Sequence, residues 1–325
     1  MSERAYPDIS LVIPLLNEAE SLPELQEWIH SVVSENQLNA EVIYIDDGSS
    51  DQSWAVIQEL AGKYGYVRGV KFSRNYGKAA GLQVGFQEAR GDIVITMDAD
   101  LQDSPEEIPE LVRMVKEDGY DLVSGWKKKR YDPISKTVPT KVYNWATRRM
   151  SGIHLHDFNC GLKAYRKSVV KNIELYGDMH RYVPVLAKRK GFDKIGEKVV
   201  AHQSRKYGKT KFGISRFIKG PIDLLTVSFM SKYGKRPMHF FGVLGALMFF
   251  IGFGVFAYIG GYKLWALYHG VLARNIAEMS VFYVALTAMI LGTQLFIGGF
   301  VSELVRVTNP DRNKYVVEDV VGSSE

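Results

Sequence analysis

Cysteine is almost missing from this 325-residue sequence, which contains only Cys160. A single cysteine cannot form an intramolecular disulfide bond, and this is typical of a chain that works in a reducing compartment. We expect Cys160 to be a small buried residue. The N-terminal stretch is polar and leads straight into an apolar strand, so we expect no cleavable signal peptide ahead of residue 240.

Two glycine-rich phosphate-binding patterns are also missing. Neither G-x-G-x-x-G nor G-x-x-x-x-G-K followed by Ser or Thr occurs in the chain. The first pattern lets the pyrophosphate of a dinucleotide approach a helix N-terminus, and the second cradles the phosphates of a nucleoside triphosphate. Their absence disfavours a dinucleotide oxidoreductase and a P-loop NTPase.

Charged side chains are missing from two long runs, residues 240–262 and 279–302. A membrane-spanning helix needs ~20 predominantly apolar residues, and both runs reach that length. Buried helices of a large soluble core are the alternative, but two glycine-rich runs separated by a short polar loop favour a helical hairpin in a membrane. We therefore predict transmembrane helices at these positions, inside a membrane segment that spans residues 239–303.

Acidic residues are scarce beside the first run. Between Lys209 and Pro237 basic residues recur and Asp223 is the one acid, whereas the loop between the runs has only Lys263 and Arg274 as basic residues. Basic residues concentrate on the cytoplasmic side of a membrane, so both flanks are expected there and the loop outside. The sequence predicts an integral, multi-pass protein of the plasma or inner membrane with both termini in the cytoplasm. Because the excess charge is juxtamembrane, we expect no nucleic-acid partner.

Apolar and basic side chains are mixed in residues 212–231, which predicts interfacial helices that lie along the membrane. The predicted organisation is a cytoplasmic domain at residues 1–210, juxtamembrane amphipathic helices at 211–238, the transmembrane pair, and a cytoplasmic C-terminal tail at 304–325.

Short apolar strands alternate with amphipathic helices in the cytoplasmic domain. Strands are predicted at residues 9–13, 41–45, 67–72 and 92–97, with helix patterns between them. This alternation predicts an α/β fold of the Rossmann-like kind, with a mostly parallel sheet and helices on both faces. Parallel strands end at the same edge, and open sheets bind their ligands at that edge.

Acids follow the fourth of these strands directly, as Asp98-Ala99-Asp100-Leu101-Gln102. Carboxylate and amide oxygens crowded at a strand end suit a hard cation, Mg²⁺ or Mn²⁺, that brings a diphosphate with it. The alternative is an acidic turn that caps the helix expected from Ser104, with Glu107 completing a capping box. Capping needs only Ser104 and leaves Asp98 and Asp100 unexplained, so the pattern favours a metal site.

Polar motifs follow the other strands as well. They are Pro14-Leu15-Leu16-Asn17-Glu18, Asp46-Asp47-Gly48-Ser49 and Arg74-Asn75-Tyr76-Gly77-Lys78. Together with the acidic strand end, these ordered motifs resemble the family 2 glycosyltransferases of GT-A fold, specifically those that load a sugar onto a polyprenyl phosphate, such as bactoprenol glucosyltransferases and dolichol-phosphate mannose synthase. The resemblance continues through residues 121–127, 157–166, 179–182 and 205–211.

The resemblance implies three groups of site residues. The nucleotide-sugar group is Pro14, Asn17, Glu18, Asp46, Lys78, Asp98, Arg205 and Lys211. The metal ligands are Asp98, Asp100 and Gln102, and the lipid phosphate is bound by Lys127, Lys136 and Thr140, although many relatives carry Arg where Lys127 stands. The residues with catalytic roles are Asp157, Asp100 and Arg205.

Each of these assignments has a simpler alternative. Asp46 and its neighbours also fit an ordinary turn and N-cap. Arg205 and Lys211 are expected to stabilise the leaving diphosphate, but attraction to anionic lipid also accounts for basic residues near a membrane. Asp157 orients groups, stabilises positive charge at the anomeric carbon, or acts as a base, and an ordinary loop cap is the structural alternative. The second pKa of a polyprenyl phosphate is near ~6, so its oxygen is already a nucleophile at neutral pH and a strong base is not required.

The resemblance implies inverting, metal-dependent transfer of a hexose, with glucose from UDP-glucose as the best match, to undecaprenyl or dolichyl phosphate at the cytoplasmic membrane face. A GDP-mannose-dependent mannosyltransferase is the nearest alternative. A processive polysaccharide synthase is disfavoured, because the Gln-x-x-Arg-Trp motif is absent. A non-catalytic GT-A membrane scaffold is disfavoured by the intact Asp98-x-Asp100 motif. The partners implied are the nucleotide sugar, the lipid and the bilayer, and a homo-oligomer remains open.

Overall fold

The computed structural model describes residues 6–128, 144–145, 147–175, 177, 179–203, 206–207, 237–272, 274–308, 315 and 317–322. The chain divides into two compact units. The first comprises residues 1–227 together with 313–325, and the second comprises residues 228–312. Each unit is described by itself.

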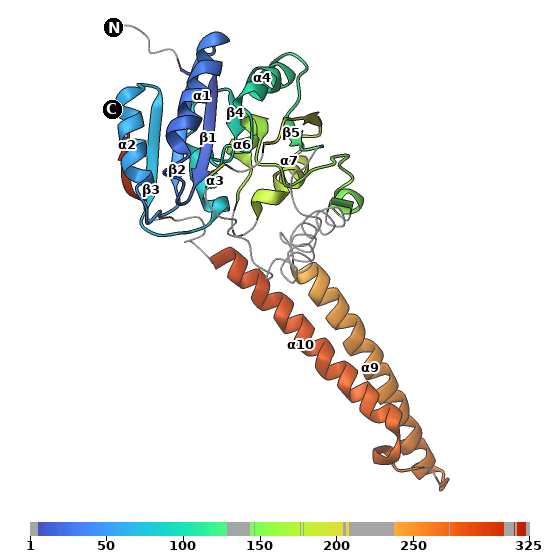
Figure 1. The fold of residues 1–325 in the computed structure, drawn as a ribbon. Coiled ribbons are helices and arrows are strands. Elements are labelled where there is room, and N and C mark those ends of the chain that lie inside the picture. Colours follow the sequence, from blue (N-terminus) through green and yellow to red (C-terminus); the bar gives the residue numbers. More distant parts are fainter. Residues whose placement is uncertain are drawn as a thin grey trace. The chain divides into compact units, whose positions relative to one another are not determined.

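An eight-stranded sheet forms the centre of the first unit, in the order β7-β5-β6-β4-β1-β2-β3-β8 (Figure 1). β1, β2, β3 and β4 are parallel, β6 runs antiparallel to β4 and β5, and β8 runs antiparallel to β3. The strands are β1 (Ile9–Leu15), β2 (Ala40–Asp46), β3 (Val67–Phe72), β4 (Ile93–Thr96), β5 (Leu122–Trp126), β6 (Lys163–Arg166), β7 (Ile195–Val199) and β8 (Val317–Val321).

The chain order of the parallel strands reverses at β1. β2 and β3 lie on one side of β1 and β4 lies on the other, so the connection from β3 to β4 crosses the sheet. Leu15 is opposite Asp46, and Val12 is opposite Thr96, so β1, β2 and β4 end close to one another. Such a switch point is where open α/β sheets bind their ligands, outside the carboxyl ends of the strands.

Helices cover both faces of this sheet. One face packs against α1, α2 and α4, and the other against α3, α6 and α7. The helices of this unit are α1 (Leu22–Glu35), α2 (Ser53–Lys63), α3 (Lys78–Glu88), η1 (Pro105–Glu107), α4 (Ile108–Lys116), α6 (Lys167–Asn172), η2 (Met179–Tyr182) and α7 (Val183–Arg189).

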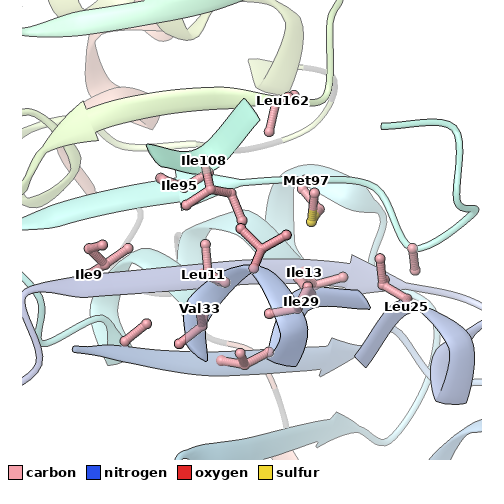
Figure 2. Close-up of a cluster of buried hydrophobic side chains, with 14 of the residues drawn as sticks. Ile9, Leu11, Ile13, Leu25, Ile29, Val33, Ile95, Met97, Ile108 and Leu162 are labelled. Carbon is pink, nitrogen blue, oxygen red and sulfur yellow. The ribbon is translucent and has the colours of Figure 1, made fainter. Parts of the chain in front are cut away.

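Alternate residues of β1 serve the two faces. Ile9, Leu11 and Ile13 point toward α1, where Leu25 and Ile29 cover them (Figure 2). A parallel strand that is buried on both sides has to be apolar at nearly every position, which is why β1 reads as a continuous apolar run. Fully burying a side chain of this size contributes roughly 1.5–3 kcal/mol, so the contact with α1 stabilises β1 in the sheet.

The start of the helix after the acidic stretch differs in detail from the expectation. Ser104 is an N-cap, because its Oγ accepts a hydrogen bond from the backbone N–H of Glu106. Glu107 does not complete a capping box but binds the backbone N–H of Ala201 (2.9 Å) and the side chain of Lys198. A contact with β7 thus replaces the local one, which sequence spacing cannot indicate.

The segment expected as a C-terminal tail supplies β8, which pairs with the edge strand β3. Asp319 accepts hydrogen bonds from the indole N–H of Trp54 (3.0 Å) and from Gln58 (3.4 Å). Lys71 forms an ion pair with Glu318 (3.0 Å). β8 covers the row of backbone hydrogen-bonding groups that β3 would otherwise expose at the sheet edge.

The second unit is a pair of long helices, α9 (Pro237–Tyr268) and α10 (Ser280–Thr308), with η3 (Ile276–Glu278) before α10; the two long helices run side by side (Figure 1). Phe240–Tyr268 and Ser280–Ser302 are each long and apolar enough to cross a membrane. Only 17% of the most apolar window in each helix is buried, which argues against the core of a soluble domain. These helices indicate association with a membrane.

The two long helices approach each other closely at small residues. A Cβ added to Gly245 would lie 2.5 Å from the carbonyl oxygen of Gly292, and one added to Gly292 would lie 2.6 Å from that of Gly245. Small residues let two helix backbones come together in a membrane, where packing rather than the hydrophobic effect drives association. Gly245 and Gly292 therefore have a packing role at this crossing.

Candidate active site

The candidate active site lies where the loops after β1, β2, β3 and β4 leave the C-terminal edge of the parallel strands. These loops carry the polar motifs singled out in the sequence. The sheet therefore brings to one edge four segments that are distant in the chain.

Asn17 connects the loop after β1 to the loop after β2. Its backbone has a φ of 51°, its Oδ1 accepts a hydrogen bond from the N–H of Ser50 (2.8 Å), and its own N–H donates to Oγ of Ser49 (2.8 Å). The N–H of Glu18 likewise donates to Oγ of Ser53 (2.9 Å). Nucleotide binding by Asn17 and Glu18 stays a prediction, and Asn17 has the additional role of shaping the second loop.

Asp46 is the last residue of β2 and is 0% exposed. Its Oδ1 accepts a hydrogen bond from the N–H of Ser49 (2.8 Å), while within the described residues its Oδ2 has no hydrogen-bond partner. Burial raises the pKa of Asp46 above its ordinary value. A buried carboxylate oxygen without a partner is costly, and it fits a hydroxyl or ring N–H of a bound ligand.

Asp47 holds the loop that leads into α3, a role that the sequence analysis did not identify. Its Oδ1 accepts a hydrogen bond from the N–H of Tyr76 (2.7 Å) and its Oδ2 accepts one from the N–H of Gly77 (2.9 Å). Gly48 passes so close that a Cβ there would lie 2.5 Å from the carbonyl carbon of Arg74, and its φ is +72°. Only glycine fits this position without displacing the loop.

Lys78 opens α3, and its ammonium group pairs with Oδ1 of Asp98, which follows β4. Burial alone would raise the pKa of Asp98, but Lys78, with Lys127 and Lys163, lowers it to about 2. Asp98 is therefore a carboxylate throughout the physiological range. Gly161 leaves room for it, because a Cβ there would lie 2.5 Å from Oδ2 of Asp98.

Asp100 and Gln102 lie on a strained turn. Leu101 between them has a φ of 60°, a conformation that leucine rarely adopts, and backbone strain of this kind concentrates at functional sites. Asp100 is 7% exposed, and its Oδ1 accepts a hydrogen bond from the N–H of Gln102 (3.2 Å). The side-chain amide of Gln102 donates to the carbonyl of Gln203 (3.4 Å), beyond β7.

The acidic turn fits a hard cation in its chemistry. Its side chains offer oxygen donors, which Mg²⁺ and Mn²⁺ prefer. In the part of the chain that the structure describes, no three His, Cys, Asp or Glu side chains form a metal-binding group. The protein would supply Asp98, Asp100 and Gln102, and water or phosphate oxygens would complete the coordination. As a ligand set these residues stay a prediction.

Lys127, which follows β5, pairs with Asp103 at the far end of the acidic stretch. Its Nζ lies 2.7 Å from Oδ1 of Asp103, which is 0% exposed. Burial alone would lower the pKa of Lys127, but Asp103 raises it above its ordinary value. The ammonium group would have to leave this buried carboxylate to reach a lipid phosphate, so that role stays a prediction, and the pair anchors the acidic stretch to β5.

Three further side chains contribute polar groups to the site. Lys163 is 3% exposed and donates a hydrogen bond to the carbonyl of the buried Cys160. In η2, Nδ1 of His180 and Nε of Arg181 are buried without a hydrogen-bond partner among the described residues. Burial holds the pKa of His180 well below its ordinary value, and Lys78 contributes to this, so the ring is neutral at pH 7. A neutral imidazole and a guanidinium N–H fit an oxygen-rich ligand.

Asp157 is 1% exposed. Its Oδ1 accepts a hydrogen bond from the N–H of Asn159 (3.0 Å), and its backbone carbonyl accepts one from Oγ of Ser124 (3.2 Å). The side chain therefore does cap its own loop, which was the structural alternative. A cap that fixes the rotamer also orients the carboxylate, so a role in the reaction stays a prediction.

Pro14 is buried within β1 and packs toward α3, where a Cβ added to Gly81 would lie 3.1 Å from Cβ of Pro14. Its predicted contact with the nucleotide is untested.

Lys136, Thr140, Arg205 and Lys211 lie outside the described residues, as do residues 212–231. Beside Arg205 in the sequence, Lys206 and Tyr207 both contact the carboxylate of Glu24 in α1, at 2.8 and 3.1 Å.

Comparisons with known proteins decide the family. Residues 10–174 match Glycosyl transferase family 2. The chain is also 34% identical over 304 residues to dodecaprenyl-phosphate galacturonate synthase of Rhizobium johnstonii, which covers 93% of this chain and 88% of that protein. The chain belongs to glycosyl transferase family 2. This glycosyltransferase is also 35% identical over 246 residues to undecaprenyl-phosphate 4-deoxy-4-formamido-L-arabinose transferase of Aeromonas hydrophila, covering 75% of this chain and 73% of that protein.

Solved structures share the GT-A α/β fold of this glycosyltransferase. Glucosyl-3-phosphoglycerate synthase from Mycobacterium tuberculosis superposes with a TM-score of 0.53 at 21% identity, over 69% of this chain and 80% of that one. Mannosyl-3-phosphoglycerate synthase from Rubrobacter xylanophilus superposes with a TM-score of 0.56 at 16% identity, over 70% and 75%. The fold class and the family predicted from the motifs are confirmed.

Proposed function

We propose that this glycosyltransferase transfers a sugar from a nucleoside diphosphate to a polyprenyl phosphate at the cytoplasmic face of a membrane. The observation that carries the proposal is the similarity, over 93% of the chain, to an enzyme named for galacturonate transfer to dodecaprenyl phosphate. The two apolar helices support a lipid acceptor, because they would keep the catalytic domain at the bilayer surface where a lipid phosphate is found.

The donor would bind across the ends of β1, β2 and β4. The free oxygen of Asp46 would accept a hydrogen bond from the ribose or the base, and Asn17 and Glu18 would complete that end of the site. Lys78, now paired with Asp98, would turn toward the diphosphate. Arg205 and Lys211 would add positive charge as the nucleoside diphosphate leaves.

Asp98, Asp100 and Gln102 would hold Mg²⁺ or Mn²⁺ against the diphosphate. A cation bound there neutralises negative charge on the leaving group. A structure of the M. tuberculosis synthase contains Mn²⁺ together with UDP-glucose, and that protein has the same fold. The ion pair between Lys78 and Asp98 would have to rearrange when donor and cation bind.

The acceptor phosphate would attack the anomeric carbon from the side opposite the diphosphate. A bond forms between a phosphate oxygen and the anomeric carbon while the bond from that carbon to the diphosphate oxygen breaks, and the electron pair leaves with the nucleoside diphosphate. Configuration at the anomeric carbon is therefore inverted. The phosphate is largely ionised at neutral pH, so Asp157 would orient the sugar and stabilise positive charge rather than act as an obligatory base.

The sugar is the least constrained part of the proposal. Glucose from UDP-glucose was predicted from the motifs, whereas the relatives are named for galacturonate and 4-deoxy-4-formamido-L-arabinose. We propose a UDP-linked pyranose as the donor class, with galacturonate and glucose as its first two candidates. The decisive test is a panel of radiolabelled UDP- and GDP-sugars, scored by transfer into lipid that partitions into organic solvent. Transfer from GDP-mannose alone would overturn the UDP assignment.

The sheet supports the predicted membrane topology. β8 comes after both apolar helices and pairs with β3 of the catalytic domain, so two membrane-spanning helices would return the chain to the side on which β3 lies. This supports two crossings with residues 263–278 outside. Single cysteines introduced at Gly270 and Glu318 test it in intact cells with an impermeant thiol reagent. Labelling at Gly270 and protection at Glu318 are expected, and the reverse pattern contradicts the topology.

A further inference from the structure

The side chain of Asn144 forms hydrogen bonds with the backbone of both residues next to Asp157, which are His156 and Phe158. Its side chain is buried, at 5% exposed, and the amide Nδ2 donates a hydrogen bond to the carbonyl of His156 (2.8 Å). Its Oδ1 accepts a hydrogen bond from the N–H of Phe158 (3.4 Å). One side-chain amide thus satisfies a backbone acceptor before Asp157 and a backbone donor after it.

Glu197 holds the same segment from β7. One carboxylate oxygen accepts a hydrogen bond from the backbone N–H of His156 (2.7 Å), and the other pairs with Nδ1 of its ring. The ring of His156 stacks on Trp126 at the end of β5, with centroids 4.1 Å apart and an interplanar angle of 13°. His156 is therefore fixed at both its backbone and its side chain, one residue before Asp157.

Ser124 completes the arrangement from inside the sheet, where its Oγ donates to the carbonyl of Asp157 itself (3.2 Å). The backbone on each side of Asp157, and at Asp157, is therefore bound by side chains from three separate parts of the chain. A loop cap needs only the local hydrogen bond that the N–H of Asn159 donates to Oδ1 of Asp157, which is also present. The additional bonds hold the backbone at and beside Asp157, which a cap does not require.

We propose that Asn144 and Glu197 are positioning residues that fix the carboxylate of Asp157 for the transfer reaction. The proposal rests on the proposed function. In the sequence Asn144 comes four residues after Thr140, which is predicted to bind the lipid phosphate.

A double-mutant cycle tests whether Asn144 acts through Asp157. Asn144→Ala should lower kcat about 10- to 100-fold, the scale of loss from a small misplacement of a reacting group, with little change in the KM for the donor. In an Asp157→Asn background the same substitution should cost less than about twofold, because residues that act as a unit are not additive. Equal losses in both backgrounds, or a loss confined to the donor KM, would overturn the proposal.

Asn144→Asp is a second variant, and circular dichroism shows whether it is folded. It keeps an oxygen that accepts from the N–H of Phe158 but places a second buried oxygen against the carbonyl of His156, so both kcat and the melting temperature should fall. Asn172→Ala is the matched control, because this exposed asparagine also donates to a backbone carbonyl, that of Ser168 (2.8 Å), on α6. It should leave kcat unchanged, and a loss as large as that of Asn144→Ala would contradict the proposal.

Hydrogen–deuterium exchange separates this proposal from the proposed function. Exchange at the amide of Phe158 should be faster in Asn144→Ala than in the wild type, and unchanged in Asn172→Ala. Unchanged exchange at Phe158 would show that Asn144 does not hold the segment. A wild-type protein that transfers no sugar from any donor would overturn the proposed function, and the exchange measurement would still decide whether Asn144 fixes the Asp157 segment.

Discussion

The ammonium group of Lys78 pairs with the carboxylate of Asp98 across the ends of two intervening strands, because β1 and β2 lie between β3, which precedes Lys78, and β4, which precedes Asp98. A lysine cation thus lies against one of the carboxylates that the sequence assigned to a divalent cation. Donor binding would have to exchange this internal pair for bonds from both groups to the diphosphate and its cation.

Replacing Lys78 tests that exchange. Lys78→Met should raise the KM for the donor about 10- to 100-fold, because a hydrogen bond to a charged group contributes ~1.5–3 kcal/mol. Steady-state kinetics with varied donor measure this. Lys116→Met, at the exposed end of α4, is the control and should leave the KM for the donor unchanged. An unchanged donor KM in Lys78→Met would remove Lys78 from the donor site.

Asp100 tests the metal assignment. Asp100→Ala should abolish transfer and leave the fold intact, because the strand-end carboxylates are needed to hold a cation with the diphosphate. Transfer is measured after EDTA treatment and again with Mn²⁺ added, alongside circular dichroism. Asp193→Ala, an exposed acid before β7, is the control. Near wild-type activity of Asp100→Ala in both buffers would show that the metal assignment is wrong.

Asp46 is expected to lower the stability of the folded protein at neutral pH. Its folded pKa is raised by burial, so the folded state holds the proton more tightly than the unfolded chain, and ionisation costs stability as the pH rises from ~3.9 through the folded pKa. Asp46→Asn removes this cost. It should raise the melting temperature near neutral pH, with a smaller gain at about pH 4.5, and weaken donor binding.

Asp51 is the control for Asp46, because its pKa is lowered in the folded protein, whereas that of Asp46 is raised. Burial opposes ionisation there too, but hydrogen bonds from Ser53 and Ala19 leave the pKa of Asp51 below its ordinary value. Its contribution to stability is present at neutral pH and is lost as the pH falls through the folded pKa. Asp51→Asn should therefore lower the melting temperature at neutral pH. A melting temperature lowered equally by both substitutions would contradict the account of Asp46.

Removal of β8 tests the role of the C-terminal segment. Deleting residues 316–325 should lower the melting temperature of the catalytic domain by about 3 °C or more. The deletion removes the backbone hydrogen bonds between β3 and β8, the ion pair of Lys71 with Glu318, and the hydrogen bond from Trp54 to Asp319. Intrinsic tryptophan fluorescence should change as Trp54 loses its partner. Deleting only residues 323–325, beyond the strand, should change neither. Equal melting temperatures for all three proteins would show that β8 adds no stability.

The alternation over the first four strands was predictable, because β1 to β4 are short, mainly apolar runs and α1 and α2 each have one apolar face. The motifs after β1, β2, β3 and β4 were predictable as a group, because a parallel sheet necessarily brings its strand ends to one edge. The pairing of Lys127 with Asp103 was not predictable, since it depends on how the chain beyond β5 turns back toward the acidic stretch.

Two further features escaped sequence reasoning for the same physical reason. β8 pairs with a strand about 250 residues earlier, and the adjacent acids Glu318 and Asp319 interrupt the alternation that marks a half-buried strand. Asp47 was overlooked beside Asp46 because its partners, the backbone N–H groups of Tyr76 and Gly77, carry no side-chain signal. Glucose was predicted from the family resemblance, whereas the relatives are named for galacturonate and 4-deoxy-4-formamido-L-arabinose.

Acceptor-dependent release of nucleoside diphosphate by the purified full-length protein tests the central claim most directly. With the donor found in the panel and Mg²⁺ or Mn²⁺ present, release should be slow without lipid, rise in proportion to added undecaprenyl phosphate, and match mole for mole the sugar recovered in the lipid phase. Release that is independent of polyprenyl phosphate, or that rises without any sugar appearing in the lipid, would contradict the account.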